Sequence, residues 1–274
     1  MLWPGAMCAR RHARPATASR AWGEERRVSA AKLIELEDGL KVFASSVMEA
    51  RFLYDEIFRA GCYDHAELPQ QPLVVDAGAN IGMFTLYVKR RYPDAEILAF
   101  EPAPQSAAVL RQNIELHGLA GVAVHEVALG SQPEQAAPFT FFPAAPGGST
   151  RYPEQTGPAR AAVSRIFSVR VAERLYQGRD ITVPVERLSA FLTAGRPVDL
   201  LKIDVEGAEL DVLLSIDPAQ WPLIRQAILE VPDHSGRLAE VCDLLSSHGL
   251  EPSAGPGPQS DTESPSRVVR AVRR

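Results

Sequence analysis

The sequence lacks the features that would place it in a membrane or link it by disulfides. No run of about 18 apolar residues occurs, so no segment has the length of a membrane-spanning helix. The cysteines are few and far apart, at Cys8, Cys62 and Cys242, and they form no C-x-x-C pair. This usage fits a reducing compartment and gives no disulfide framework. We therefore expect a cytoplasmic protein with no membrane partner.

The charge balance also lacks a basic excess. The 274 residues carry a formal net charge of −5, with 46% hydrophobic and 23% charged residues. This composition is ordinary for a globular protein, and the length allows one large domain with extensions. An acidic chain offers no electrostatic reason to expect nucleic acid as a partner. No His, Cys and Asp cluster has the spacing of a metal site, so we expect no required metal.

The first 23 residues contain no acid at all. They hold four arginines, at Arg10, Arg11, Arg14 and Arg20, among many alanines and prolines. A transit peptide can have this composition, whereas the apolar core of a secretory signal is lacking. We interpret residues 1–27 as a disordered extension and residues 28–274 as a single domain.

The most informative segment is PLVVDAGANIGMFT at residues 72–85. Apolar residues lead into Asp76, then Gly78, Asn80 and Gly82 follow at alternate positions, and an apolar helix begins. This pattern predicts a buried parallel strand, a tight turn and a helix start. Because glycine has no Cβ, the backbone of such a turn can approach a ligand closely. We expect these four residues to contact a cofactor.

A second apolar strand, residues 95–100, ends in Glu101. An acid at this place, about 20 residues past the glycines, is suited to bind a ribose diol. The turn is not the G-x-G-x-x-G of dinucleotide sites, and Asp76 would repel a pyrophosphate but suit a cation. S-adenosylmethionine, which carries a sulfonium and an amino group, is therefore favoured over NAD. An NAD-dependent oxidoreductase of the same fold stays the alternative.

Strands and helices alternate along the chain. The expected strands are residues 73–76, 96–100, 122–127, 198–204, 227–231 and 267–272, and the expected helices are residues 49–58, 83–91, 104–117, 208–215 and 238–248. This alternation predicts an α/β fold with a doubly wound, mostly parallel, Rossmann-like sheet that binds ligands at its carboxyl edge. Residues 131–180 break the rhythm and are expected to be an insertion that forms a lid or substrate wall. Residues 252–266, rich in Pro and Ser, are expected to be a surface loop.

Four blocks of this sequence resemble the FkbM family of S-adenosylmethionine-dependent methyltransferases. They read VVDAGANIGMFT at 74–85, FEP at 100–102, VERLSAFL at 185–192 and LLKIDVEGAELDVL at 200–213. The segments MEARFLYDEIF at 48–58 and FTFFPAAPGGST at 139–150 resemble members from polyketide and peptide antibiotic pathways. The resemblance covers roughly residues 40–250. It implies a class I methyltransferase fold and methylation, most simply of a hydroxyl on a small natural product or an attached sugar. Carboxyl and N-methylation stay open.

The resemblance assigns roles along the cofactor. The residues expected to hold it are Asp76, Gly78, Asn80 and Gly82 at the methionine part, Glu101 at the ribose, and Glu126 or Ala128 beside the adenine. Asp204 would hold the amino group or face the acceptor, although an acid there would also suit a helix N-cap.

The expected catalytic base is His234, with Glu206 second and Asp204 third, because methyl transfer needs an aligned acceptor and removal of its proton. Many family members read Glu-Val-His-Asp after the fifth strand, whereas this chain reads Glu-Val-Pro-Asp-His at 230–234. The tail, SRVVRAVRR, is also short for the closing strand pair. Both departures leave open a domain that binds the cofactor without turnover.

Overall fold

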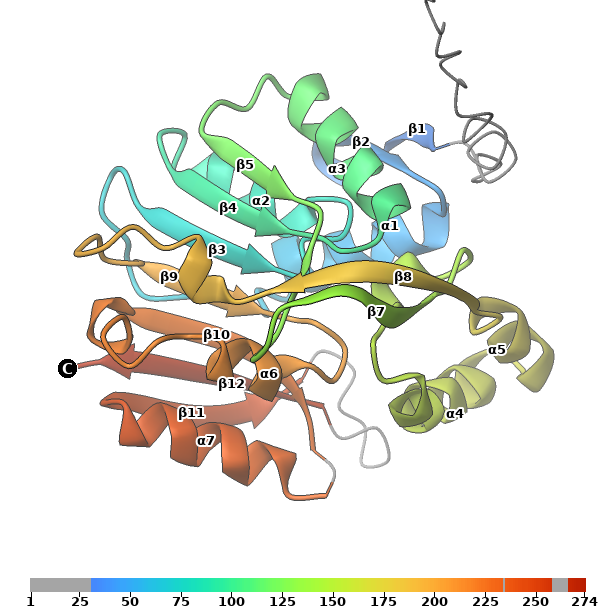
Figure 1. The fold of residues 1–274 in the computed structure, drawn as a ribbon. Coiled ribbons are helices and arrows are strands. Elements are labelled where there is room, and N and C mark those ends of the chain that lie inside the picture. The colour runs from blue at the N-terminus through green and yellow to red at the C-terminus, as the bar shows by residue number, and fades with distance from the viewer. Residues whose placement is uncertain (1–30, 234, 258–265) are drawn as a thin grey trace, which may run out of the picture. The chain divides into compact units, whose positions relative to one another are not determined.

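A seven-stranded sheet forms the centre of the molecule (Figure 1). The computed structural model describes residues 31–233, 235–257 and 266–274, so the expected extension at 1–27 lies outside them. The strands of this sheet, in spatial order, are β11 (Leu250–Pro256), β12 (Ser266–Arg273), β10 (Gln226–Pro232), β9 (Leu200–Ile203), β3 (Leu73–Ala77), β4 (Glu96–Phe100) and β5 (Val122–His125). Strands β10, β9, β3, β4 and β5 run parallel to one another. Strand β12 pairs antiparallel with β10, and β11 pairs antiparallel with β12 at the edge of the sheet.

The strand order reverses at β3. From β3 the chain proceeds outward through β4 and β5, and then returns to place β9 and β10 on the other side of β3. The carboxyl ends of β3 and β9 therefore border the crevice at which open α/β sheets bind ligands. The expected doubly wound, mostly parallel α/β fold is confirmed.

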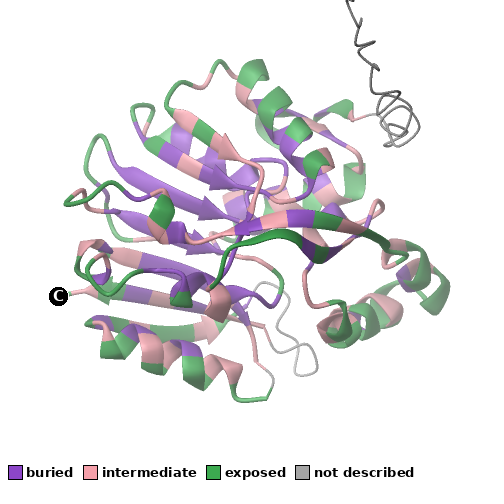
Figure 2. Ribbon diagram, viewed as in Figure 1, coloured by how far each residue is buried: buried purple, intermediate pink, exposed green. Residues whose placement is uncertain are grey.

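Helices cover both faces of the sheet. One face packs against α1 (Val47–Tyr54), α2 (Met83–Arg91) and α3 (Pro104–Leu116), and the other against α6 (Glu209–Leu214) and α7 (Arg237–Ser247). The inner strands are consequently buried along their length, as Figure 2 shows for the middle of the sheet. This double cover explains why their sequences read as continuous apolar runs. None of the described helices is long and apolar enough to cross a membrane.

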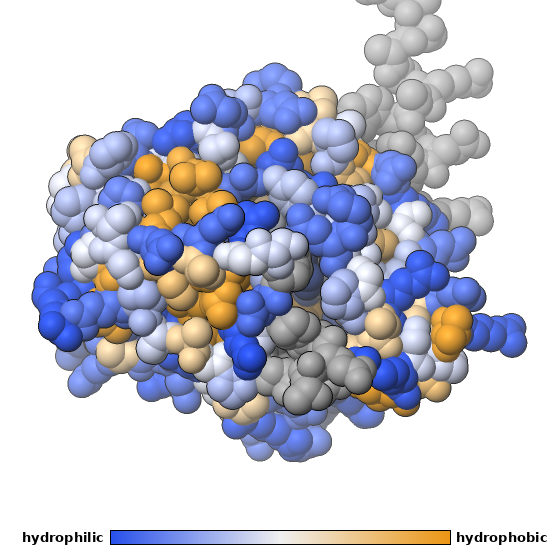
Figure 3. Space-filling model, turned by 90° about the horizontal axis from the view of Figure 1, so that it is seen from below, coloured by the Kyte–Doolittle hydropathy of each residue, from blue (hydrophilic) through white to orange (hydrophobic). Residues whose placement is uncertain are grey.

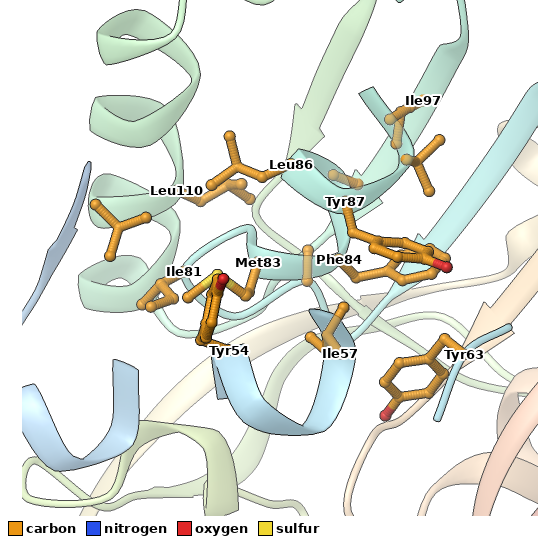
Figure 4. Packing of buried hydrophobic residues seen from close by; sticks show 14 of the residues in the cluster. Tyr54, Ile57, Tyr63, Ile81, Met83, Phe84, Leu86, Tyr87, Ile97 and Leu110 are labelled. Carbon is orange, nitrogen blue, oxygen red and sulfur yellow. The ribbon is translucent and has the colours of Figure 1, made fainter. Parts of the chain in front are cut away.

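The N-terminal part of the domain packs over α2. Strands β1 (Lys32–Glu35) and β2 (Lys41–Ala44) form a hairpin, and α1 continues into η2 (Asp55–Arg59), a single π-helical turn. Figure 4 shows Ile57 of this turn lying against the helix that carries Phe84, with Tyr63 beside it. The rings of Tyr63 and Phe84 meet edge to face at 5.4 Å between centroids. This packing fixes the position of η2 against the sheet.

Residues 131–180 leave the main sheet. Strands β6 (Ala128–Leu129), β7 (Glu134–Phe141) and β8 (Arg179–Glu186) form a small sheet, and α4 (Gly157–Ile166) and α5 (Val169–Leu175) lie between β7 and β8 along the chain. The weak periodicity of this segment had indicated neither helix. Both helices are largely exposed, with one fully buried alanine each, which explains the weak pattern.

Two expectations for the C-terminal part were wrong. Residues 252–256 of the expected loop instead belong to β11, whose seven residues pair with Arg267 to Arg273 of β12. The closing strand pair is thus complete despite the short tail. Residues 258–265, the rest of the expected loop, lie outside the described residues. The prolines of β11 had indicated a loop. Pro252 and Pro256 are tolerated in β11 because it is an edge strand, where a missing N–H need not break the sheet.

Candidate active site

A cavity of about 770 Å³ opens at the carboxyl edge of the sheet. It is lined by the turn after β3, the ends of β4, β9 and β10, helix α1 with η2, and parts of the 131–180 segment. Of the expected site residues, it brings together Gly78, Asn80, Glu101, Ala128, Asp204 and Glu206. Asp76, Gly82 and Glu126 do not line it.

The turn after β3 is held tightly against β9. Gly78 has φ +78°, and a Cβ at this position would overlap the backbone carbonyl oxygen of Asp204. Glycine is therefore required at position 78 by the close approach of the segment after β9, whether or not a ligand also contacts this turn. Asn80 also adopts a left-handed conformation, with φ +47°. Gly82 begins α2 on the far side of the turn, where an added Cβ would meet Leu110.

Asp76 meets a cation of the protein itself. Asp76 on β3 is paired in register with Lys202 on β9, and the Lys202 ammonium lies 3.2 Å from one Asp76 carboxylate oxygen. The hydroxyl of Thr85 donates to the other oxygen at 2.9 Å. Burial opposes the charge on Lys202, but Asp76 and Asp204 outweigh it, so the pKa of Lys202 is raised. Asp76 therefore supports the turn from beneath, which leaves direct contact with a ligand to its neighbours.

Lys202 also fixes the two strand ends to each other. Its ammonium donates to the carbonyl oxygen of Gly78 at 2.7 Å and lies 3.6 Å from a carboxylate oxygen of Asp204. A lysine that is only 2% exposed needs such partners, because an unpaired buried charge is costly. Lys202 thus joins Gly78 to Asp204, and all three residues line the cavity at the crevice between β3 and β9.

Glu101 stands at the end of β4 and lines the cavity. Its two carboxylate oxygens accept the backbone N–H of Asn80 and of Ala103, each at 2.9 Å. Burial raises the pKa of Glu101 to about 7, against the lowering effect of these two N–H groups. Because each carboxylate oxygen has two lone pairs, both can accept a further hydrogen bond from a ligand.

The wall beyond Glu101 is apolar. Val127, Ala128 and Leu129 line the cavity next to it. Glu126, by contrast, is half-exposed and pairs with Arg111 on α3 at 2.5 Å. Of the two residues predicted beside an adenine, the structure thus brings Ala128 to the cavity and directs Glu126 elsewhere.

The loop after β9 carries two acids into the cavity. The hydroxyl of Tyr63 donates to the Asp204 carboxylate at 2.9 Å. Glu206 adopts φ +52°, and its carbonyl oxygen accepts the Thr150 hydroxyl at 2.6 Å, which ties this loop to the 131–180 segment. Glu206 is exposed to the solvent, and the surrounding protein together with the carboxylates of Asp204 and Glu230 raises its pKa.

Three acids that line the cavity, Glu49, Glu56 and Glu230, were not predicted as site residues. Glu56, on η2, is only 8% exposed and lines the cavity, and its carboxyl forms no hydrogen bond or ion pair with another described residue. Burial, together with the charges of Glu230 and Asp204, raises the pKa of Glu56 to about 9. Glu230, near the end of β10, has its pKa raised to about 8 by burial and by Asp204.

The opposite wall is apolar and comes from two distant parts of the chain. Met48, Phe52 and Leu53 of α1 line it, as do Val163, Ile166 and Phe167 of the α4–α5 region. Ile166 and Phe167 are 69% and 56% exposed. On the face drawn in Figure 3, the coloured hydrophobic residues form separate groups among hydrophilic ones, with no single apolar surface among the described atoms.

Buried polar groups also face this cavity. The side-chain amide of Asn80 and one Glu49 oxygen are buried and form no hydrogen bond of ordinary geometry with a described residue, although Asn80 lies close enough to Glu49 to lower its pKa. The other Glu49 oxygen accepts the Gly147 N–H at 2.7 Å. Burial raises the pKa of Glu49 to about 7. Such groups are expected where a polar ligand completes a site.

His234, the expected base, lies outside the described residues, between Asp233 and Ser235. Its predicted role therefore stays a prediction. Across residues 31–233, 235–257 and 266–274, no group of three or more His, Cys, Asp and Glu side chains is placed to hold a metal ion.

Comparison with known proteins agrees with this geometry. The model of the methyltransferase FkbM domain matches residues 76–251, which is more than half of the chain. The chain belongs to the FkbM methyltransferase family. Methyltransferase 1 of Beauveria bassiana is 42% identical over 222 residues, which cover 79% of this chain and 88% of that protein. The 31-O-demethyl-FK506 methyltransferase FkbM of Streptomyces tacrolimicus is 36% identical over 232 residues, covering 79% and 88%.

A solved structure shows the same fold. The FkbM methyltransferase from Methylobacillus flagellatus superimposes with a TM-score of 0.53 at 13% identity. The match covers 80% of this chain, which spans about half of that longer protein (47%). The FkbM-family chain described here therefore has the Rossmann-like fold of class I methyltransferases, as its sequence blocks predicted.

Proposed function

We propose that this protein transfers a methyl group from S-adenosylmethionine to a hydroxyl oxygen of a small, largely apolar natural product or of a sugar attached to one. The proposal rests on the position of Glu101 in a chain of this methyltransferase family. Glu101 is buried at the end of β4, beside the turn after β3. Its carboxylate is fixed by two backbone N–H groups and retains lone pairs toward the cavity.

The residues present fit this cofactor. Glu101 would accept the ribose hydroxyls, and the apolar wall at Ala128 would border the adenine. The buried amide of Asn80, which forms no hydrogen bond of ordinary geometry, would meet the methionine part, together with the backbone of Gly78. When bound, the cofactor supplies a methyl group already activated by the positive sulfur.

The remaining space fits an apolar acceptor with a polar reacting group. Apolar side chains of α1 and of the α4–α5 region line one wall, whereas Asp204, Glu206, Glu230 and Glu56 gather at the crevice between β3, β9 and β10. The relative from Streptomyces tacrolimicus is named for a 31-O position, which supports oxygen as the methylated atom. A small-molecule acceptor also agrees with the acidic net charge, which does not favour nucleic acid.

The protein has two tasks in this reaction, alignment and proton removal. Alignment of the acceptor oxygen with the methyl group lowers the barrier by roughly 7–11 kcal/mol in favourable cases. As the oxygen–carbon bond forms, the carbon–sulfur bond breaks with its electron pair on sulfur, and the hydroxyl proton passes to a base. We propose His234 as that base, with Asp204 and Glu206 as the alternatives that the cavity brings close.

Binding tests the cofactor assignment. Calorimetry on the full chain should show binding of S-adenosylhomocysteine and S-adenosylmethionine and none of NADH. A protein that binds NADH, or that binds neither S-adenosylmethionine nor S-adenosylhomocysteine, would contradict the proposal. Tight binding without methylation of any acceptor would instead support the alternative of a domain without turnover.

An acceptor panel tests the chemistry. Apolar compounds with hydroxyl groups, and matched analogues with amines or carboxyls, should be incubated with isotopically labelled cofactor and analysed by mass spectrometry. We expect label on hydroxyl oxygen only. With an active acceptor, Phe167→Ala should raise KM by about tenfold through lost apolar contact, with S-adenosylhomocysteine affinity unchanged. Val169→Ala, an exposed change nearby but off the cavity, is the control.

A further inference from the structure

The charges that line the cavity are unbalanced. Among the residues that the structure describes, six carboxyl side chains line it, against two cations, Lys202 and Arg151; the carboxyls are those of Glu49, Glu56, Glu101, Asp204, Glu206 and Glu230. Lys202 is occupied by Asp76 and Asp204, and Arg151 lies within 4.0 Å of Glu134 and Asp211. Among the described residues, the carboxyls that line the cavity thus outnumber the cations that could compensate their charge.

Glu56 is the clearest case. It lies on the π-helical turn η2 and is only 8% exposed, and its carboxyl has no polar partner among the described side chains and backbone groups. An ionised carboxylate in this position would be strongly destabilising, so the group holds a proton as long as nothing compensates its charge. A position on the wall of a ligand cavity means that a ligand can supply this compensation.

The charged and titratable groups around Glu56 come from several elements. They are Glu230 on β10, Lys202 at the end of β9, Asp204 and Glu206 after it, and Tyr63 and Cys62 after η2. Of the charges that act on Glu56 itself, only Lys202 is cationic, and Asp76 and Asp204 already share its charge. Arg270 on β12 acts on the neighbouring Cys62, whose carbonyl oxygen accepts from its guanidinium at 2.7 Å. The acids therefore oppose the ionisation of one another.

We propose that Glu56, together with Glu230, forms a seat for the positive sulfur end of the methyl donor, and that the arriving cation makes these carboxyls release protons. This inference rests on the proposed function, since it takes the donor to be a sulfonium compound. Glu230 is on β10, and the charges that act on Glu56 are those of Glu230, Asp204 and Lys202, not that of Glu101 after β4. This arrangement agrees with a donor whose nucleoside lies at Glu101.

The seat distinguishes the donor from its product. Loss of the methyl group converts the sulfonium into a neutral thioether, which no longer compensates a carboxylate. The carboxyls would then take their protons back. Binding of S-adenosylmethionine should release protons to the buffer, whereas binding of S-adenosylhomocysteine should release fewer. Affinity for the sulfonium compound should also rise between pH 7 and pH 8.5, because less work is needed to ionise the acids.

The test is calorimetry of the full chain at pH 7, in two buffers that differ in ionisation enthalpy. The slope of binding heat against that enthalpy gives the number of protons released. We expect between about one and two protons for S-adenosylmethionine in the wild type, since each of the two linked carboxyls releases at most one. Glu56→Gln should reduce this number and weaken S-adenosylmethionine by about tenfold, an effect expected for a lost charged partner, while changing S-adenosylhomocysteine less.

Asp55→Asn is the matched control. Asp55 is the preceding residue on the same turn, is exposed, and accepts a hydrogen bond from Arg59 at 2.9 Å. It should release as many protons as the wild type. Equal release for S-adenosylmethionine and S-adenosylhomocysteine in the wild type would overturn the inference without any variant. So would unchanged release in Glu56→Gln. A complete lack of S-adenosylmethionine binding would instead contradict the proposed function.

Discussion

At the β4 end of the cavity, the Glu101 carboxyl is held by two backbone N–H groups, whereas at the β10 end the Glu56 carboxyl has no partner among the described residues. The first arrangement is rigid before any ligand arrives, and it suits recognition of a fixed nucleoside. The second is incomplete until charge is supplied, and it suits a group whose charge changes during the reaction. The comparison teaches that a carboxyl fixed by hydrogen bonds suits binding of the nucleoside, whereas a carboxyl without a partner suits the part of the ligand whose charge changes.

The largest expected effect breaks the connection between the two ends. Gly78→Ala places a Cβ on the carbonyl oxygen of Asp204, so the turn and β9 must separate. We expect loss of measurable S-adenosylhomocysteine binding and a lower melting temperature. Gly118→Ala is the control, because Gly118 also has a positive φ but has nothing within 4 Å. Equal behaviour of the two variants would show that backbone strain alone, and not the contact with β9, requires Gly78.

The next effect concerns the reacting end. If His234 removes the acceptor proton, His234→Ala should lower turnover by about 10²-fold with cofactor affinity unchanged. The rate of the wild type should then rise near pH 6–7, the range in which histidine titrates. A silent His234→Ala together with a severe Asp204→Asn would transfer the role of base to the carboxyls of the loop after β9.

A smaller effect concerns the nucleoside end. Glu101→Ala should weaken S-adenosylhomocysteine binding by about 1–3 kcal/mol, because the ribose hydroxyls and the Asn80 N–H lose their acceptor. Glu96→Ala, at the other end of the same strand, removes an exposed acid that pairs with Arg196. Calorimetry should show wild-type affinity for this control. Wild-type affinity in folded Glu101→Ala would remove the ribose assignment.

The smallest expected effect is on the pH dependence of stability, and it tests whether Glu56 is protonated in the folded protein. Folding raises the pKa of Glu56 to about 9 and that of Glu230 to about 8, so the folded state binds more protons than the unfolded state. The stability from this source is present below the ordinary carboxyl pKa and is lost as pH rises toward 9. The melting temperature should therefore fall from pH 6 to pH 9, and less steeply in Glu56→Gln than in Asp55→Asn. Parallel curves would show that Glu56 does not titrate in this range.

Local patterns predicted the fold and one end of the site. The expected helix 83–91 and strand 96–100 agree with α2 and β4 residue for residue, because apolar runs with clear stops define them. Glu101 was found because its place at a strand end depends on spacing alone. The β9 strand is shorter than the expected 198–204, since Val198 forms only an isolated bridge with Ile224.

The rest required contacts between distant segments. Lys202 was passed over as a site residue, although a lysine in a buried parallel strand beside a buried aspartate indicates an ion pair. Glu56 shares the apolar face of its helix with Phe52 and Leu53, and an acid on such a face is a signal that periodicity alone treated as noise. The grouping of Glu56 with Glu230 joins residues from η2 and β10, which no local pattern reveals.

The most direct test of the central claim is a crystal structure of the full chain with S-adenosylhomocysteine. The account predicts ribose hydroxyls within hydrogen-bond distance of the Glu101 carboxylate, adenine against Ala128, and the sulfur at the crevice between β3 and β9, toward Asp204 and Glu56. A ligand bound elsewhere, or bound here with its ribose away from Glu101, would contradict it.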